Sequence, residues 1–471
     1  MRRPLISLLL LALISTAEAN IAENSGFGSR TTALAGAGVA WGSGPFSTYS
    51  NPAALGAFSA SELVATQKSP PLQASWGLIF LTPQFKAIQG VVLENNYVSD
   101  KSPARSGDVD TSYRNTLGQA FALSYRLSEG PTRLTVGFSG FIPIEQLAYA
   151  DTGETYIPEY VLQRSRTQRP QFAGAAGMQL SEHWSMGAGV EIGFALTGNG
   201  SVFLNTDPNK PSTMRFSASM KPKALPYAGI LFHSNKDKLT GGLVVRAPLS
   251  SPNEYTLNSS ARAFGNLAAL DFNFKADSAL YYDPLSIELG GSYAVLARTR
   301  VVAQLEYQRW SNFQPPALNI QNPQTGTCTG GGCSGGIQIS PSNNPSFNFN
   351  DTWVPRLGVE HQLNDEQTFR LGYFYRPGII DPSQLSGAGN LLDPARHAFS
   401  AGFGWRFHQF LHLDTPFTLD IDAQFQVLQT QTISKSAGNE AGTPGDQKIG
   451  SPGYQAGGKI FGGGLTLSWA F

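Results

Sequence analysis

The sequence has little charge, only two cysteines and no long hydrophobic run beyond its N-terminus. Asp, Glu, Lys and Arg make up 14% of the 471 residues, and 33 acidic residues balance 33 basic ones, so the formal net charge is zero. A chain without a basic excess offers no electrostatic footprint for nucleic acid, and we expect no such partner. After Ile14 no segment approaches the roughly 20 apolar residues that a membrane-spanning helix needs. We therefore expect no transmembrane helix in the mature chain.

Patterns typical of metal sites and of catalysis are missing as well. The six histidines show no metal-ligand spacing, and we find no nucleophile elbow, phosphate-binding loop or ordered triad. Cys328 and Cys333 lie in a glycine-rich stretch of an exported chain, where a small loop disulfide is expected rather than a metal site. We therefore expect a protein that is not an enzyme and that has no cofactor and no metal.

The first residues have the pattern of a cleavable secretory signal. Arg2 and Arg3 precede the apolar run Leu5–Ile14, and the small residues of Ala17-Glu18-Ala19 follow. This order predicts a signal peptide over residues 1–19, cleaved after Ala19. An exported chain without a spanning helix is either soluble or an outer-membrane β-barrel.

Alternation of apolar and polar residues favours the barrel. In Thr299–Trp310 an apolar row that includes Leu305 alternates with a polar row that includes Glu306. In Phe417–Leu428 the polar row holds Asp420 and Asp422, which could not face lipid, so the polar rows should face the barrel interior. A soluble sandwich is the alternative, in which the apolar rows would form the core.

The spacing between these segments alternates between short and long, as it does between periplasmic turns and outer loops of a barrel. We count about sixteen strands, including a doubtful one near Ser61–Gln67. The expected short turns are Thr82–Gln84, Ser128–Pro131, Ser181–His183, Asn235–Lys238, Ala297–Thr299, Asn364–Glu366 and Leu411–Pro416. The expected outer loops are 95–116, 142–168, 197–212, 250–284, 311–351, 378–396 and 433–456.

The last eight residues alternate in the same way and end on an aromatic residue. Leu465, Leu467, Trp469 and Phe471 form one apolar row, which should face lipid. We expect Trp469 and Phe471 to act as the signal that the barrel assembly machinery recognises. The predicted location is the outer membrane of a Gram-negative bacterium, crossed many times by β-strands.

A segment behind the signal peptide breaks the alternation. Residues 25–40 are rich in small residues, including Gly36 and Gly38, and Asn51-Pro52-Ala53 follows soon after. This composition predicts a compact plug rather than a wall strand. Here the chain resembles the FadL family of outer-membrane long-chain fatty acid transporters, whose N-terminal hatch carries a glycine-rich stretch and an Asn-Pro-Ala motif. The resemblance continues at residues 305–313, 353–358, 364–373 and 393–402, whereas residues 60–280 match by pattern only.

The resemblance implies an all-β fold, a transmembrane antiparallel barrel of 14 strands with an N-terminal hatch that plugs the lumen. We expect 14 strands and keep 16 as the alternative. The expected domains are the signal peptide (1–19), the hatch (20–58) and the barrel (59–471). Asn51, Pro52, Ala53, Gly36 and Gly38 are the expected hatch and gating residues, with the Asn51 side chain bonded to backbone groups.

The function that the resemblance implies is passive uptake of a long-chain fatty acid or another hydrophobic molecule. Outer loops would capture the molecule, a lumenal apolar pocket would hold it, and a gap in the wall would release it when the hatch moves. Gly137, Gly140 and Pro143 are candidates for the strand kink that makes this gap. The candidate capture residues, which could instead merely pack the loops together, are Phe313, Leu318, Ile320, Ile379, Leu391 and Leu392.

A carboxylate ligand would need a basic partner in the lumen. Arg356, Arg370, Arg376 and Arg406 lie in inward rows and are our candidates. Most inward arginines should instead join a network with Glu306, Glu360, Glu366, Asp420 and Asp422. The family's own carboxylate-binding residues cannot be transferred, because the stretches that hold them do not align here.

Three other functions stay open at this point. The chain could be a structural or secretion-complex protein of the same fold that transports nothing, a channel specific for hydrocarbons, or a diffusion porin for small polar solutes, although a plugged lumen speaks against the porin. Besides a hydrophobic small molecule, the expected partners are outer-membrane lipid, lipopolysaccharide and the barrel assembly machinery. We expect a monomer.

Overall fold

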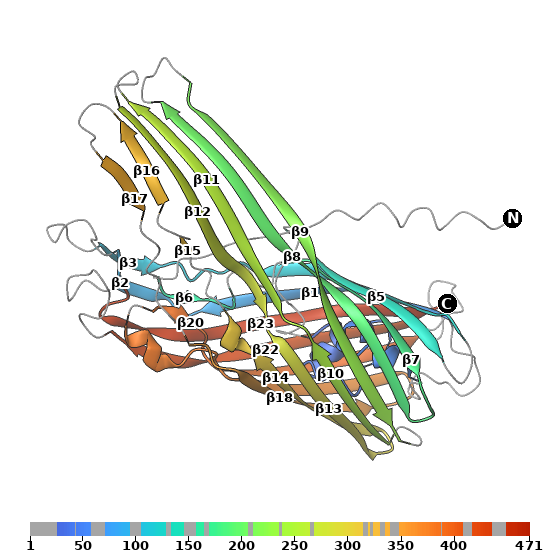
Figure 1. Cartoon of the computed structure of the whole chain (residues 1–471). Helices are drawn as coiled ribbons and strands as arrows, with labels where there is room; N and C mark the ends of the chain where they lie inside the picture. The colour runs from blue at the N-terminus through green and yellow to red at the C-terminus, as the bar shows by residue number, and fades with distance from the viewer. Residues whose placement is uncertain are drawn as a thin grey trace.

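A closed ring of antiparallel strands surrounds the N-terminal segment in the computed structural model of the chain (Figure 1). The ring closes because the last strand, β23, pairs with the first, β1, from Gln73 opposite Ala470 to Phe85 opposite Gly458. The structure describes residues 26–42, 44–57, 71–94, 105–128, 133–145, 157–163, 169–205, 211–234, 238–263, 268–313, 319–320, 324–329, 335–339, 348–387, 389–407, 417–435 and 449–471.

The ring has 14 strands, as expected, and each pairs with the next around the barrel. Closure leaves no unpaired edge among them at the level of the membrane, which satisfies the backbone groups where water is absent. In order, they are β1 (Leu72–Phe85), β4 (Thr116–Arg126), β5 (Leu134–Pro143), β7 (Gln171–Gln179), β8 (Trp184–Asn205), β9 (Thr213–His233), β10 (Leu239–Arg246), β13 (Leu285–Leu296), β14 (Thr299–Arg309), β18 (Thr352–Gln362), β19 (Gln367–Arg376), β21 (Arg396–Phe407), β22 (Phe417–Ser434) and β23 (Gly453–Ala470).

The predicted orientation of the alternating rows is confirmed. Leu305 of β14 and Ile421 of β22 point outward and are 41% and 49% exposed, whereas Glu306 and Asp420 are buried on the inside. An apolar outer face is what lipid requires, and the charged side chains of these wall strands therefore lie in the lumen at the level of the membrane.

The end of the barrel with short connections is here called the turn end. Of the predicted turns that the structure describes in full, those at Ser181–His183, Ala297–Thr299 and Asn364–Glu366 are confirmed, whereas most of Ser128–Pro131 and of Asn235–Lys238 lies outside the described residues. Between β18 and β19 the Asn364 side chain accepts hydrogen bonds from the backbone N–H groups of Glu366 and Gln367, at 2.9 and 2.8 Å, as turn asparagines do. The prediction of a turn at Thr82–Gln84 is wrong, because β1 continues through it. Pairing of β1 with β4 ends at Leu81, so Pro83 has a neighbouring strand, β23, on one side only. Proline is tolerated there because its missing N–H costs no hydrogen bond on the unpaired side.

That error accounts for one of the two additional strands in the count of sixteen, and the alternative of a 16-stranded barrel is wrong. The residues after β1 form β2 (Ile88–Glu94), which pairs with β3 (Arg105–Val109) in a hairpin apart from the ring. The doubtful strand at Ser61–Gln67 and the turn at Leu411–Pro416 lie outside the described residues.

At the opposite end, here called the loop end, part of the sheet extends far beyond the ring (Figure 1). Residues 197–212 and 250–284 were expected to be loops, but they largely continue as strands. The upper half of β8 pairs with β9 on one side and in parallel with β11 on the other. Their polar, glycine-containing sequences hid the alternation. The added strands are β11 (Leu249–Ala263), β12 (Ala268–Asp283), β15 (Asn319–Ile320), β16 (Gln324–Thr329) and β17 (Gly335–Ile339).

Short elements lie inside the ring and over its opening at the loop end. No described helix is long and apolar enough to cross a membrane. Over the mouth, β6 (Glu159–Tyr160) pairs in parallel with β20 (Leu391–Leu392), and the Glu159 N–H donates to the Asn390 carbonyl at 3.1 Å. The helices are α2 (Ser29–Ala33), α3 (Ser47–Ser50) and α4 (Ala53–Gly56) inside the ring, and the 3-10 turns η4 (Trp310–Asn312) and η5 (Pro382–Ser386) at the loop end.

Candidate functional site

Residues 26–57, which we call the hatch, fill the barrel lumen at the level of the membrane. Helix α2 packs on β19, β21, β22 and β23, whereas α4 packs on β5, β7, β8 and β9. Three aromatic side chains hold the segment together, with the Phe27 ring 5.2 Å from that of Phe46 and 5.1 Å from that of Tyr49. The hatch therefore contacts opposite sides of the wall and closes the passage between them.

Glycines on the inner wall make room for the hatch. A Cβ atom on Gly187 would lie 2.6 Å from the Ala53 nitrogen, and one on Gly242 would lie 2.5 Å from the Val39 carbonyl oxygen, closer than real side chains approach. Ten wall strands have a glycine whose added Cβ would lie within 3.4 Å of hatch atoms: Gly137, Gly177, Gly187, Gly229, Gly242, Gly290, Gly358, Gly372, Gly402 and Gly464.

The Asn-Pro-Ala motif lies against three of these glycines, Gly177, Gly187 and Gly229. Asn51 is fully buried, and its side-chain amide donates to the carbonyl oxygens of Val39 at 2.8 Å and of Ile230, in β9, at 3.2 Å. Its side-chain oxygen accepts from the Ala53 N–H at 3.0 Å, and Pro52 precedes α4 as its N-cap with φ −62°. One asparagine thus joins two parts of the hatch to the wall.

The two hatch glycines singled out by the sequence occupy different places. Gly36 has φ +81°, which favours glycine, and a Cβ there would lie 2.6 Å from the guanidinium of Arg356. Gly38 packs against Thr31 and Ser50, where a Cβ would meet side-chain atoms at 3.1 and 3.2 Å. Both lie between the hatch segments that carry α2 and α3.

Three of the candidate ligand arginines are paired with carboxylates of the protein. Arg356 pairs with Glu306 at 2.8 Å, and Arg376 pairs with Asp393 at 2.8 Å. Arg370 contacts both Glu360 and Asp420 at 2.6 Å. Arg406 is half-buried near the turn end, where its backbone N–H donates to the Glu366 carbonyl at 2.8 Å. A ligand carboxylate would have to displace one of these internal pairs, and the ligand role stays a prediction.

The hatch shares this network. Arg30 of α2 reaches Glu360 at 3.1 Å, and the Trp41 indole N–H donates to the same carboxylate at 2.9 Å. Arg356 donates to the Ala35 carbonyl at 2.9 Å. On the side of β14, β18 and β19, hatch and wall are therefore held together by buried charge-assisted hydrogen bonds.

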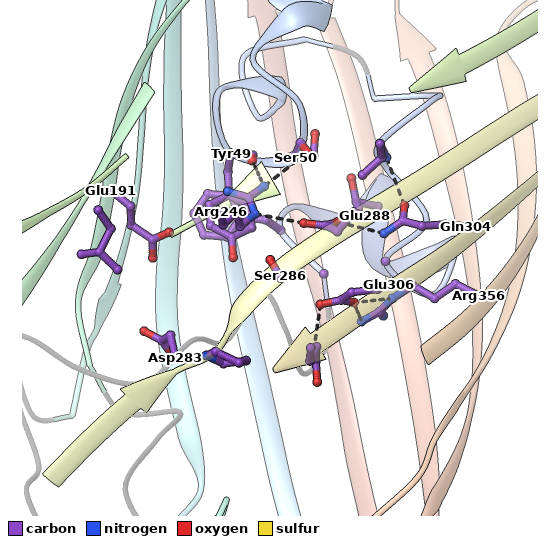
Figure 2. Close-up of a pocket in the computed structure, with 18 of the residues that line it drawn as sticks. Tyr49, Ser50, Glu191, Arg246, Asp283, Ser286, Glu288, Gln304, Glu306 and Arg356 are labelled. Atoms are coloured by element: carbon purple, nitrogen blue, oxygen red, sulfur yellow. Dashed lines mark hydrogen bonds and ion pairs between the residues drawn. The ribbon is translucent and has the colours of Figure 1, made fainter. Parts of the chain in front are cut away.

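A cavity of about 60 Å³ lies between the hatch and the wall strands β8, β10, β13, β14 and β18. Its charged lining, seen in Figure 2, includes Glu191, Arg246, Glu288, Glu306 and Arg356. The cavity thus combines charged groups with apolar ones such as Phe27 and Leu225, whereas the resemblance implied an apolar lumenal pocket.

The candidate capture residues that the structure describes are buried rather than exposed. Phe313, Ile379, Leu391 and Leu392 belong to one apolar cluster at the loop end. Burial is what we expect if these residues pack the loops together, and their role in capturing a hydrophobic molecule stays a prediction. Leu318 and the Ile320 side chain lie outside the described residues.

The same cluster includes Tyr160 of β6, whose contacts hold this strand in place over the opening of the barrel at the loop end. Its hydroxyl donates to the Gly457 carbonyl at 2.9 Å, and its ring stacks on that of Phe85 with centroids 4.1 Å apart. Burial raises the pKa of Tyr160 to about 12, so this hydroxyl stays protonated at any physiological pH.

The kink candidates Gly137, Gly140 and Pro143 all lie on β5, the third strand of the ring. Pairing of β5 with β4 runs from Thr135 to Pro143 without a register shift. Outside Gly140 lie the rings of Phe121, Phe138 and Phe172, and a Cβ on Gly140 would lie 2.7 Å from Phe121. The wall is thus closed here, and a lateral gap stays a proposal.

The remaining predicted sites are placed as follows. Trp469 of β23 lies opposite Ala74 of β1, and the Phe471 N–H donates to the Leu72 carbonyl at 2.8 Å, so both belong to the seam that closes the ring. Cys328 lies in β16, but Cys333 is outside the described residues, and the disulfide stays a prediction. Among the residues that the structure describes, no group of His, Cys, Asp and Glu could hold a metal.

Sequence reasoning missed the residues that bind the hatch from β9, β10 and β13. Hydrogen bonds to hatch carbonyls come from Tyr227 and Arg246, and Glu288 accepts a hydrogen bond from Arg246. Arg246 ends an inward row that also contains Thr240 and Val244, so the alternation itself could have found it. It escaped notice because residues 60–280 carry no recognisable motif.

Comparison with known proteins agrees with this architecture. A family model described as "Outer membrane protein transport protein (OMPP1/FadL/TodX)" matches residues 8–448. Alkane uptake protein A of Marinobacter nauticus is 24% identical over 190 residues, which are 40% of this chain and 37% of that relative, so the match spans little more than a third of the relative's length.

Two solved structures share the fold. A FadL homologue of Pseudomonas aeruginosa aligns with a TM-score of 0.57 at 14% identity, covering 94% of this chain and 98% of that one. The toluene transporter TodX of P. putida aligns with a TM-score of 0.52 at 14% identity, covering 95% and 99%. Such low identity shows the fold alone. The family match over most of the sequence shows that the chain belongs to the OMPP1/FadL/TodX family of outer-membrane transport proteins.

Proposed function

We propose that this protein admits long-chain fatty acids or other hydrophobic molecules through the outer membrane without an energy source, and that the hatch is the gate. The observation that carries the proposal is the seating of the hatch against opposite sides of the wall. A solute cannot pass along the lumen unless the hatch shifts. This arrangement argues against an open diffusion porin for small polar solutes.

One side of the lumen suits an apolar cargo. Ile79 of β1, Ala120 of β4 and Phe141 of β5 are buried in the same apolar cluster as Phe27 of the hatch and Leu391 of the mouth. The charges lie on the other side, along β10, β14, β18 and β19. Burial of apolar surface gains about 25 cal/mol per Å², so a hydrophobic molecule would follow the apolar side by exchanging contacts with these residues.

Release would occur sideways near β5 and not through the cavity lined by Glu191, Arg246 and Glu288. Gly140 leaves the wall thin between Phe141 on the inside and the Phe121, Phe138 and Phe172 rings on the outside. Movement of these rings, together with the weak pairing of a glycine-containing strand, would open a path to lipid. Gly137 of the same strand touches Thr48 and Leu55 of the hatch, which would couple the opening to hatch movement.

A channel specific for hydrocarbons is the second candidate, and one observation favours it. Arg356, Arg370 and Arg376 are all occupied by carboxylates of the protein, so none is held ready for a fatty acid. The relatives include an alkane uptake protein and a toluene transporter. A neutral cargo would need no basic partner.

Uptake by cells lacking the protein and by cells expressing it tests both candidates. Labelled oleate and labelled hexadecane should each be compared, and mass spectrometry of lipid co-purified with the protein should agree with the preferred cargo. Uptake of oleate supports the first candidate, and uptake of hexadecane alone supports the second. Uptake of neither would favour a structural or secretion-complex role without transport.

The gate itself is tested with the double variant Asn51→Ala, Pro52→Ala. The variant loses the bonds from Asn51 to Val39 and Ile230 but no pairing between wall strands. We expect uptake of the preferred cargo to fall several-fold while heat-modifiable barrel accumulates normally in the outer membrane. Normal uptake, or loss of the folded barrel, would contradict gating by the hatch.

A further inference from the structure

Arg246 joins the wall to the hatch just before the Asn-Pro-Ala motif. It lies on the inner face of β10 with 9% of its surface exposed. Its Nε donates to Glu288 at 3.0 Å, and its Nη2 donates to the carbonyl oxygens of Tyr49 and, at 3.3 Å, of Ser50. The rings of Tyr49 and Tyr227 lie 4.3 and 4.9 Å from the guanidinium carbon, so the group is enclosed on both faces.

The hatch needs these donors because of its own sequence. A helix leaves its last carbonyls without partners unless later N–H groups reach them. After α3, Pro52 has no N–H, and the Ala53 N–H is taken by the Asn51 side chain. The wall supplies the missing donors: the Tyr227 hydroxyl donates to the Thr48 carbonyl, and Arg246 serves the next two carbonyls.

The contacts of Arg246 belong to a closed circuit, part of which is drawn in Figure 2. Glu288 accepts from Gln304 at 2.9 Å, and Gln304 accepts from the Val39 N–H at 3.2 Å. The Val39 carbonyl accepts from Asn51, which follows Ser50 in the chain. Both arms of the hatch, at Val39 and at Tyr49 to Asn51, are thus fastened through the Arg246–Glu288 ion pair.

The guanidinium also has an alternative set of acceptors. Its Nη1 is buried and has no hydrogen-bond partner. The cavity beside it is lined by the carboxylates of Glu191 on β8 and Glu306 on β14, and Figure 2 shows Glu191 on the side of Arg246 away from Glu288. A turn of the side chain toward these groups would release the hatch carbonyls without leaving a buried charge unpaired.

We propose that Arg246, paired with Glu288, is the latch that holds the hatch closed, and that opening begins when Arg246 releases the carbonyls of Tyr49 and Ser50. This inference rests on the proposed function, because a latch serves a hatch that moves. Arg246 is a positioning residue and needs no contact with the cargo.

Hydrogen–deuterium exchange of the purified, lipid-reconstituted full-length barrel tests the latch directly. Arg246→Met should raise the exchange rate of peptides from residues 44–57 at least several-fold, whereas strand peptides of β18 and β19 stay protected. Glu288→Gln should give a smaller increase in the same peptides. Arg376→Met removes an arginine that is buried still more deeply and whose ion-pair partner, Asp393, lies outside the hatch, and it should leave hatch exchange at the wild-type rate.

An unchanged exchange rate of residues 44–57 in folded Arg246→Met would overturn the latch, as would an equal increase in Arg376→Met. If Arg246→Met does not fold, Glu288→Gln decides, because it keeps the shape of the side chain and removes the charge that holds Arg246. An increase in hatch exchange then supports the latch, and no increase overturns it. If hatch exchange responds as expected but wild-type protein carries neither oleate nor hexadecane, the latch stands and the transport proposal falls.

Discussion

The hatch can lie against the wall at Gly177 of β7 and Gly187 of β8 because these residues have no side chain. The two glycines lie opposite one another in the register of the strands, and both face Pro52. A Cβ on either would collide with backbone atoms, which cannot rotate away as the end of a long side chain can. Close approach of two backbones is one reason for glycine inside a strand.

We therefore predict that Gly177→Leu displaces residues 52–56 from the wall while the barrel still assembles. The expected results are cleavage of the hatch by added protease and altered uptake, with normal amounts of folded protein. Gly174→Leu is the matched control, since it lies on the same strand and an added Cβ there meets nothing within 4 Å. Equal protease resistance of the two variants would show that the glycine is not needed for the hatch.

Among the elements, α2 and the strands β18, β19 and β22 are joined by one chain of charges. Arg30 of α2 and Arg370 of β19 share Glu360 of β18, and Arg370 also binds Asp420 of β22. The side chains of Glu360, Arg370 and Asp420 are all about 10% exposed or less. Such a network is stable only when every member is paired, because an isolated buried charge is costly.

Arg370→Met should consequently destabilise the folded barrel by about 3–5 kcal/mol, because it leaves two carboxylates with fewer partners. Urea unfolding of the protein in lipid vesicles, followed by heat-modifiability on gels, measures the change. Arg298→Met breaks an exposed ion pair with Asp365 at the turn end, with side chains 53% and 95% exposed, and should change stability by about 1 kcal/mol or less. A similar effect of both substitutions would contradict the role of burial.

Across the whole molecule, the short and long connections lie at opposite ends of the barrel, and β23 closes it beside β1. The parity of 14 strands places the connection that carries β15, β16 and β17 at the loop end. Loops of this length face the cell exterior in outer-membrane barrels, whereas short turns face the periplasm.

The orientation predicts that Cys328 and Cys333 are accessible from outside. After mild reduction, a membrane-impermeant maleimide should label intact cells that express the protein. A Cys328→Ser, Cys333→Ser variant provides the unlabelled control. Labelling that occurs only after the outer membrane is broken would reverse the assigned orientation.

The sequence by itself determined the class of fold, the direction of each recognised row and the existence of a plug. Alternation sufficed for β14 and β22, because Glu306 or Asp420 toward lipid would be prohibitive. The break in alternation around Gly36 and Asn51 marked the hatch for the same reason. The strand count near Pro83 failed, since a proline looks like a turn unless its neighbours are known.

Only the tertiary structure decided what the inward residues contact. Alternation predicted a network of inward arginines and carboxylates but not the individual pairs. Arg356 binds Glu306, and Arg370 binds Glu360 and Asp420, as members of that network, whereas the partner of Arg376 is Asp393 of a loop, which the sequence did not indicate. Arg246 and the wall glycines have no local sequence signature, because their role is to contact the hatch. For Arg246 the contacted hatch residue lies some two hundred positions earlier in the chain. A sequence pattern with a period of two assigns a side chain to a face of the wall, whereas its partner across the lumen depends on how the closed ring brings the strands together.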